Sequence, residues 1–185
     1  MAALFAAYAA FSGVQTQIAL QRKAFNLSQA DAIAVRLGRL ADLQLAARRL
    51  QERIDIELQA PYVMGIFPAK DVAARDKQIQ THKAALEGAM ADATAFETAV
   101  VRAPIRPETQ RVADGYMSAI RDMEYALTIA LGDLKDNATI DARSKPQLGE
   151  AFGKVRTAFE ALKQLVEFEV ETLKRRHDSL VEESN

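Results

Sequence analysis

The sequence predicts an all-α protein, an antiparallel up-down four-helix bundle with an extended or kinked N-terminal helix. Apolar residues recur every three or four positions along almost the whole chain, which is the spacing of an amphipathic helix. No run of alternating apolar and polar residues is long enough for a strand. The 185 residues include only 8 glycines and 5 prolines. That length suffices for one sizeable core but is too short for two ordinary domains.

Residues 1–25 are expected to form an apolar N-terminal helix that precedes a bundle over residues 26–185. No charged side chain occurs before Arg22. Two interpretations are open: the end of a membrane helix that continues into the bundle, or an Ala-rich helix that docks on the bundle or on a second copy. Asn26 and Ser28 mark a start or a kink. Basic residues directly after an apolar stretch favour a cytoplasmic location for the domain on their C-terminal side.

The first bundle helix is predicted over residues 28–59. Its apolar stripe advances in steps of three and four: Ile33, Leu37, Leu40, Leu43, Ala47, Leu50, Ile54 and Leu58. Pro61, Gly65 and Pro68 end this helix. The connection over 60–69 is unusually apolar, so we expect it to cap the bundle end, with a dimer contact or a ligand lid as alternatives.

Three further helices are predicted over residues 71–102, 108–136 and 146–182. The first has apolar residues every seven positions. Pro104 and Pro107 separate it from the next helix, and Pro107 suits a first helical turn. Ser144 and Gln147 have the spacing of a capping box before the last helix.

Composition and motifs exclude many functions. The net charge of −1 gives no electrostatic case for a nucleic-acid partner. The chain has no Cys, which removes disulfides, thiolate metal sites and Cys nucleophiles. It also lacks Glu-x-x-His pairs, a Gly-rich phosphate loop, His-Glu-x-x-His and Gly-x-Ser-x-Gly. We therefore predict no enzyme, no catalytic residue, no cofactor and no metal.

His82 lies on the apolar seam of the second bundle helix, one heptad after Arg75. One interpretation places both at a widening bundle end, with Arg75 paired to Asp55. The other is a polar layer that lines a small pocket and binds an anion such as a carboxylate or nitrate. Folding the hairpins about their loops places His82 level with Arg48, Arg49, Thr128 and Lys154.

Two acidic residues weaken the polar-layer interpretation. Glu52 and Glu150 lie four residues from Arg48 and Lys154, where ordinary helix-surface pairs form. Glu169 stands where the last stripe calls for an apolar residue, and we expect a stutter in the repeat there rather than a buried functional carboxylate.

Several short segments carry a resemblance. They are Leu50-Gln51-Glu52-Arg53, the stretch from Arg75 to Leu86, and Tyr116-Met117-Ser118-Ala119-Ile120. With the apolar lead-in, this layout resembles the extracytoplasmic sensor modules of bacterial chemoreceptors and sensor kinases, and it is similar in detail to the nitrate- and nitrite-sensing type. Ile54 stands where that type tends to have Gly.

The resemblance implies a small anionic or polar ligand bound between helices through arginines of the first helix, here Arg48, Arg49 and Arg53. It also implies a homodimer that signals by a small shift of the last helix. The predicted function is the sensor domain of a transmembrane receptor in the bacterial inner membrane, with the domain in the periplasm or alternatively in the cytoplasm. A non-enzymatic helical adaptor is the alternative function.

Overall fold

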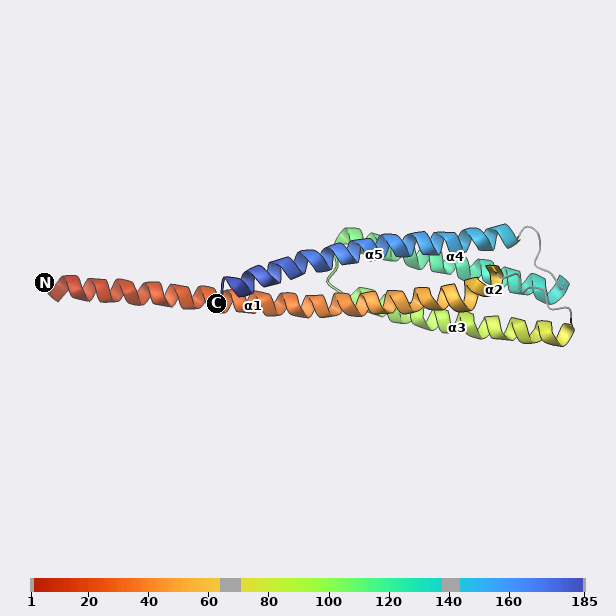
Figure 1. Cartoon of the computed structure of the whole chain (residues 1–185), viewed down its shortest axis with the longest axis horizontal. Coiled ribbons are helices and arrows are strands. Elements are labelled where there is room, and N and C mark those ends of the chain that lie inside the picture. Colours follow the sequence, from red (N-terminus) through yellow and green to blue (C-terminus); the bar gives the residue numbers. More distant parts are fainter. Residues whose placement is uncertain (1, 64–70, 138–143, 185) are drawn as a thin grey trace. The chain divides into compact units, whose positions relative to one another are not determined.

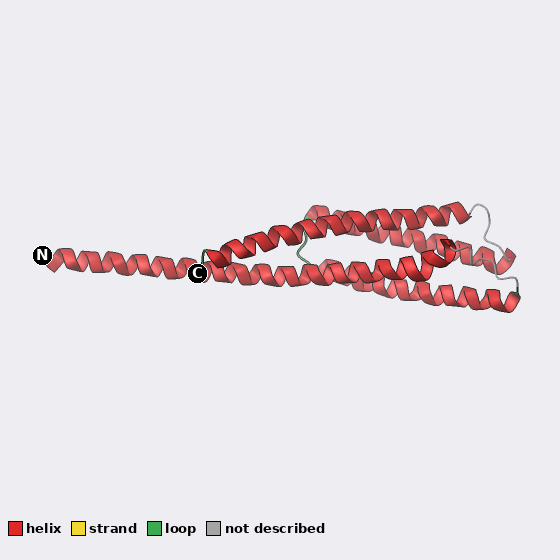
Figure 2. Ribbon diagram, in the orientation of Figure 1, coloured by secondary structure: helices red, strands yellow, loops and turns green. Residues whose placement is uncertain are grey.

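A computed structural model describes residues 2–63, 71–137 and 144–184 of the chain. Its elements are α1 (Ala2–Arg53), the π-helix η1 (Ile54–Gln59), α2 (Ala60–Val63), α3 (Val72–Arg102), α4 (Pro107–Asn137) and α5 (Ser144–Glu182) (Figures 1 and 2). No strand occurs in the described ranges. The predicted all-α helical bundle is confirmed. Most of the apolar connection over 60–69 lies outside the described residues.

Helix α1 passes through Asn26 and Ser28 without interruption, so no helix starts there and the N-terminal helix extends into the bundle. Asn and Ser in a helix interior cost at most about 0.7 kcal/mol relative to Ala, which long helices tolerate. The chain divides into two compact units, and the predicted domain boundary between residues 25 and 26 stays a prediction. Unit 1 comprises Met1–Gly38 and Glu169–Asn185, and unit 2 comprises Arg39–Phe168.

Unit 2 contains the four-helix core. Consecutive long helices are antiparallel. Helices α3 and α4, for example, lie side by side and are joined by a short connection (Figure 1). Apolar stripes from all four helices meet in its centre, because each helix places residues three and four apart on one face. The largest side chains that are less than 2% exposed are Tyr116, Phe96, Phe152, Leu40, Leu43, Leu50, Ile54, Leu58, Ile120, Met123, Leu134 and Leu148.

The π-helix η1 is explained by the spacing of the apolar stripe. Leu50, Ile54 and Leu58 are separated by two consecutive steps of four, and all three are at most 1% exposed. In an α-helix, two such steps rotate a stripe by about 80° away from the core, because the helix has 3.6 residues per turn. The i→i+5 hydrogen bonds of a π-helix wind the chain less per residue, so the same three positions stay on one face.

The start of α5 is tied to α4 by a side-chain hydrogen bond, and the predicted capping box of Ser144 and Gln147 stays a prediction. The Ser144 hydroxyl donates a hydrogen bond to Asp133 Oδ2 on α4 at 2.5 Å. Ser144 is buried, and α5 begins at this residue. A hydrogen bond to a charged carboxylate is stronger than one between neutral groups, so this bond ties the start of α5 to α4.

Unit 1 consists of the first part of α1 and the last part of α5. Ala30 and Ile33 on α1 and Leu173 on α5 are its buried apolar side chains among the described residues. Glu169 is 2% exposed, and its Oε2 lies 3.2 Å from Arg36 Nη2. Instead of the expected stutter in the repeat, position 169 holds a buried carboxylate whose charge is balanced by an arginine of the neighbouring helix. None of the helices in the described residues combines the length and apolar character needed to cross a bilayer.

Candidate functional site

The residues predicted to bind a ligand do not form one layer. Arg48, Arg49, Thr128 and Lys154 are exposed, Arg53 is half-buried and His82 is buried. Arg53 pairs with Asp92, which is ten residues beyond His82 on α3. At 1.5 Å per residue, the levels of Arg53 and His82 are about 15 Å apart along the helix. The prediction that His82 lies level with Arg48 was wrong, because it assumed that the chain reverses direction in the middle of the 60–69 loop. In the structure Arg53 lies opposite Asp92, and the position halfway between these two residues in the sequence is where α3 begins.

Lys154 and Thr128 have partners on their own helices. Lys154 Nζ lies 2.9 Å from Glu150 Oε1, which is the surface pair that the spacing suggested. This hydrogen bond and the charge of Glu150 raise the pKa of Lys154 above its ordinary value. Thr128 Oγ1 donates to the Glu124 backbone oxygen at 2.8 Å. No comparable ion pair joins Arg48 to Glu52 among the described residues.

Arg53 contacts two acidic residues, Asp92 and Glu57, and its guanidinium lies next to Gly88. Its Nε lies 2.6 Å from Asp92 Oδ2, and its Nη1 lies 3.2 Å from Glu57 Oε1. The hydrogen bond to Asp92 and its negative charge raise the pKa of Arg53. A methyl group at Gly88 would stand 2.8 Å from Arg53 Nη1, so a larger residue there would require the end of the Arg53 side chain to shift. Arg53 is committed to this protein network and is poorly placed to bind an added anion.

His82 is 5% exposed on the buried face of α3. Burial lowers its pKa below the ordinary value, and a hydrogen bond with the Gln78 backbone acts in the opposite direction. His82 is therefore neutral at pH 7 and offers no positive charge to a ligand. The expected pair of Arg75 with Asp55 is absent among the described residues; Asp55 Oδ1 instead accepts a hydrogen bond from Gln51 Nε2 at 2.9 Å.

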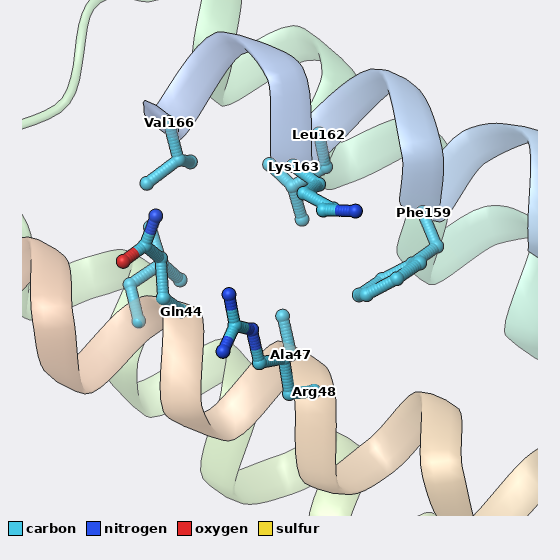
Figure 3. Close-up of a pocket in the computed structure, with 8 residues that line it drawn as sticks. Gln44, Ala47, Arg48, Phe159, Leu162, Lys163 and Val166 are labelled. Carbon is cyan, nitrogen blue, oxygen red and sulfur yellow. The ribbon is translucent and has the colours of Figure 1, made fainter. Parts of the chain in front are cut away.

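A small pocket lies between α1 and α5 within unit 2 (Figure 3). Apolar side chains form its floor, and the polar ends of Gln44, Arg48 and Lys163 border it. Its volume of about 10 Å³ corresponds to room for about one water molecule. The lining residues are Leu43, Gln44, Ala47, Arg48, Phe159, Leu162, Lys163 and Val166.

Arg48 is the one predicted ligand-binding residue that lines this pocket. Gln44 and Lys163 were missed by the sequence reasoning, although a signal for them exists. Each of the three polar residues directly follows an apolar stripe position, as Gln44 follows Leu43. A residue in that position flanks the contact with the neighbouring helix, so it reaches the edge of any gap between the two helices.

One layer of unit 2 takes a side chain from each long helix, three of them buried and the fourth, Phe159, half-buried. The Tyr116 layer consists of Gln51 of α1, Phe96 of α3, Tyr116 of α4 and Phe159 of α5. The Tyr116 ring meets Phe96 edge-on with centroids 5.4 Å apart, and its centroid is 5.9 Å from that of Phe159. The Tyr116 hydroxyl donates to Gln51 Oε1 at 3.2 Å. Burial, and secondarily the charge of Asp55, raise the pKa of Tyr116, so its hydroxyl remains a donor.

Comparison with protein-family models, curated proteins and solved structures finds no match to this chain. The resemblance to sensor domains therefore stays a prediction from short sequence segments. The structure adds a pocket between the first and last helices, a cationic rim on that pocket, and beside it the aromatic Tyr116 layer with its buried Tyr116–Gln51 hydrogen bond.

Proposed function

We propose that this chain is the ligand-sensing domain of a bacterial transmembrane receptor and that it binds a small anion between α1 and α5. The observation that carries the proposal is the pocket bordered by Arg48, Lys163 and Gln44 over an apolar floor. A guanidinium presents paired donors that fit a carboxylate or nitrate, an ammonium adds charge, and an amide adds a neutral donor.

The small volume of the pocket supports a mechanism. A ligand larger than one water enters only if α1 and α5 move apart, so binding favours a packing with a wider gap. The ligand shifts the equilibrium by the difference in its affinity for the two packings. Helices α1 and α5 each contribute residues to both units, so a change at the pocket has a covalent path out of unit 2.

The sequence resemblance supports the part of the proposal that concerns the receptor. Location in the inner membrane with the domain in the periplasm, assembly as a homodimer and a role in chemotaxis belong to the proposal on that ground, with a cytoplasmic location as the alternative. The proposed role requires no catalytic residue, cofactor or metal, because it needs only binding and a helix shift.

Thermal unfolding against a panel of sodium salts tests the proposal. The panel contains nitrate, acetate, succinate, benzoate and glutamate at constant ionic strength, with chloride as the reference. A ligand at about 100 times its Kd stabilises the folded state by about 2.7 kcal/mol. We expect one class of anion to raise the Tm saturably in the wild type and to lose this effect in Arg48→Ala and Lys163→Ala.

Matched control variants lie beside the pocket residues. Arg49→Ala removes an exposed arginine next to Arg48 that does not line the pocket, and Lys154→Ala removes another α5 lysine. Both controls should keep the wild-type response. Absence of a saturable shift across the panel, or an unchanged shift in Arg48→Ala, would contradict the proposal.

A helical adaptor is the second candidate function, and one observation favours it. Phe11, Val14, Ile18 and Phe25 of α1 are 62, 53, 45 and 62% exposed. Their spacing of three, four and seven residues puts them on one side of the helix, as in a surface that packs against another helix. This candidate predicts no saturable effect of any anion in the panel.

A further inference from the structure

Phe159 belongs both to the α1/α5 pocket and to the Tyr116 layer. It lines the pocket beside Arg48 (Figure 3), and its ring is tilted by 48° against the ring of Tyr116. The Tyr116 hydroxyl donates to Gln51, and the Gln51 amide donates to Asp55 Oδ1 at 2.9 Å. Asp55 is the second residue of η1. An unbroken series of contacts therefore leads from the pocket wall into the π-helix.

The packing around Tyr116 leaves its ring little freedom to absorb a displacement. Tyr116 and Phe96 are 0% exposed, and Phe96 meets the Tyr116 ring at an interplanar angle of 87°. Close-packed interiors transmit small displacements because they contain few voids. A movement of Phe159 away from or toward the core therefore changes the position of the Tyr116 hydroxyl.

Burial makes the hydrogen bonds of this series sensitive to such a change. Gln51 is 5% exposed, so its amide cannot exchange a protein partner for water without cost. A buried polar group that loses its partner is penalised far more than an exposed one. When the Tyr116 hydroxyl moves, the Gln51 side chain must follow it or lose the bond, and either outcome disturbs the Gln51–Asp55 bond.

The series ends at the junction of α1 and η1, where the backbone has two possible hydrogen-bonding patterns. The i→i+5 pattern of a π-helix is rare and frequently found at functional sites, and the alternative is the ordinary i→i+4 pattern. The bond from Gln51 to Asp55 spans the junction between α1 and η1. A change in that bond biases the balance between the two patterns in Ile54–Gln59.

We propose that Tyr116 is a positioning residue that couples the α1/α5 pocket to η1, so that the occupancy of the pocket changes the backbone hydrogen bonding of Ile54–Gln59. As a statement about regulation by a ligand, this inference rests on the proposed function. The coupling between Phe159 and η1 is a property of the protein alone and is measured without any ligand.

Hydrogen exchange of backbone amides, followed by mass spectrometry on the full chain, tests the coupling. The variants are Tyr116→Phe, which keeps the ring and removes the hydroxyl, Phe159→Leu, and the double variant. Loss of one hydrogen bond is worth about 1 kcal/mol, which corresponds to about fivefold faster exchange. We expect about that increase in peptides covering Ile54–Gln59 for each single variant, with no further increase in the double variant.

A merely structural role for these residues gives a different result. Leu162→Ala serves as the control, because Leu162 is buried on α5 and lines the same pocket without a ring contact to Tyr116. It should speed exchange throughout unit 2 in proportion to the loss of stability in urea, with no selective effect on η1. Additive effects in the double variant, or exchange in η1 that only follows global stability, would overturn the coupling.

The anion panel separates failure of the coupling from failure of the proposed function. With sodium benzoate or nitrate as the probe, whichever stabilises the wild type, exchange in η1 should change in the wild type and stay constant in Tyr116→Phe. A thermal shift without a change in η1 contradicts the coupling and leaves the proposed function standing. If no probe binds, the proposed function fails, and the variants alone still decide the coupling.

Discussion

His82 shows how one residue can be placed from sequence while its chemistry depends on the fold. Its heptad position on an apolar seam predicts that it faces other helices, and the structure buries it to 5% exposure. Its role as a charged anion ligand could not be judged from sequence, because that depends on desolvation. Burial lowers its pKa, so the side chain is a neutral member of the core at pH 7.

The lowered pKa of His82 predicts that the protein loses stability in mild acid. Below about pH 6.5 the unfolded chain binds a proton at this position more readily than the folded chain does, so the free energy of unfolding falls as the pH falls. Above that pH both states are neutral and the effect vanishes. Urea unfolding at pH 7.5 and 5.5 should therefore show a smaller decrease for His82→Gln than for the wild type.

The other histidine provides the control for this prediction. The chain has two histidines, and the His177 side chain near the end of α5 is 32% exposed. His177→Gln, measured at the same two pH values, removes this more exposed histidine and leaves His82 in place. Equal losses of stability in His82→Gln and the wild type would show that protonation of His82 does not oppose folding.

At the scale of single elements, the sequence predicted where helices lie better than how each one is built. The expected helix over 71–102 is Val72–Arg102 in the structure, and the one over 108–136 is Pro107–Asn137. Proline and the apolar period mark such ends locally. The π-helix was not predicted, although the steps of four from Leu50 to Leu58 are visible in the sequence. Its hydrogen-bonding pattern is selected by packing in the core.

The π-helix predicts an unusual tolerance to deletion. Its i→i+5 bonds hold one residue more per turn than an α-helix, so removing Ile56, which is 69% exposed, lets the segment close as α-helix without rotating the flanking residues. We expect a loss of less than about 1 kcal/mol. Removing Arg49 from α1 should cost more than about 3 kcal/mol, because every later core residue of the helix rotates by about 100°.

Urea unfolding of the two deletion variants measures this difference, and circular dichroism shows whether each retains its helix content. A deletion of Ile56 that is as damaging as the deletion of Arg49 would mean that η1 carries no surplus residue.

At the scale of the whole molecule, the helical class and the number of long helices can be derived from periodicity alone. The division into units at Gly38 and Glu169 cannot, since it depends on which segments pack together across the chain. The prediction that Arg48 and His82 lie at the same level of the bundle was wrong for the same reason. A helix face can be read from spacing, but the vertical alignment of two helices is decided by contacts such as Arg53 with Asp92.

The two units should differ in local stability. Unit 1 buries few apolar side chains, whereas unit 2 contains all of the large side chains that are less than 2% exposed among the described residues. Segments with few buried contacts open at lower free energy. Helix α1 supplies an internal comparison: its amides over residues 15–38 should exchange faster than those over 39–53. Equal protection along α1 would show that the chain opens as one cooperative structure.

The glycine beneath Arg53 limits how this sequence can drift. Because the Arg53 guanidinium occupies the space where a side chain at position 88 would begin, a larger residue there requires the end of the Arg53 side chain to move away or to be shortened. Shortening Arg53 in turn leaves Asp92 without its cation. Positions 53, 88 and 92 therefore form a set in which the effect of a substitution at one position depends on the residues at the other two.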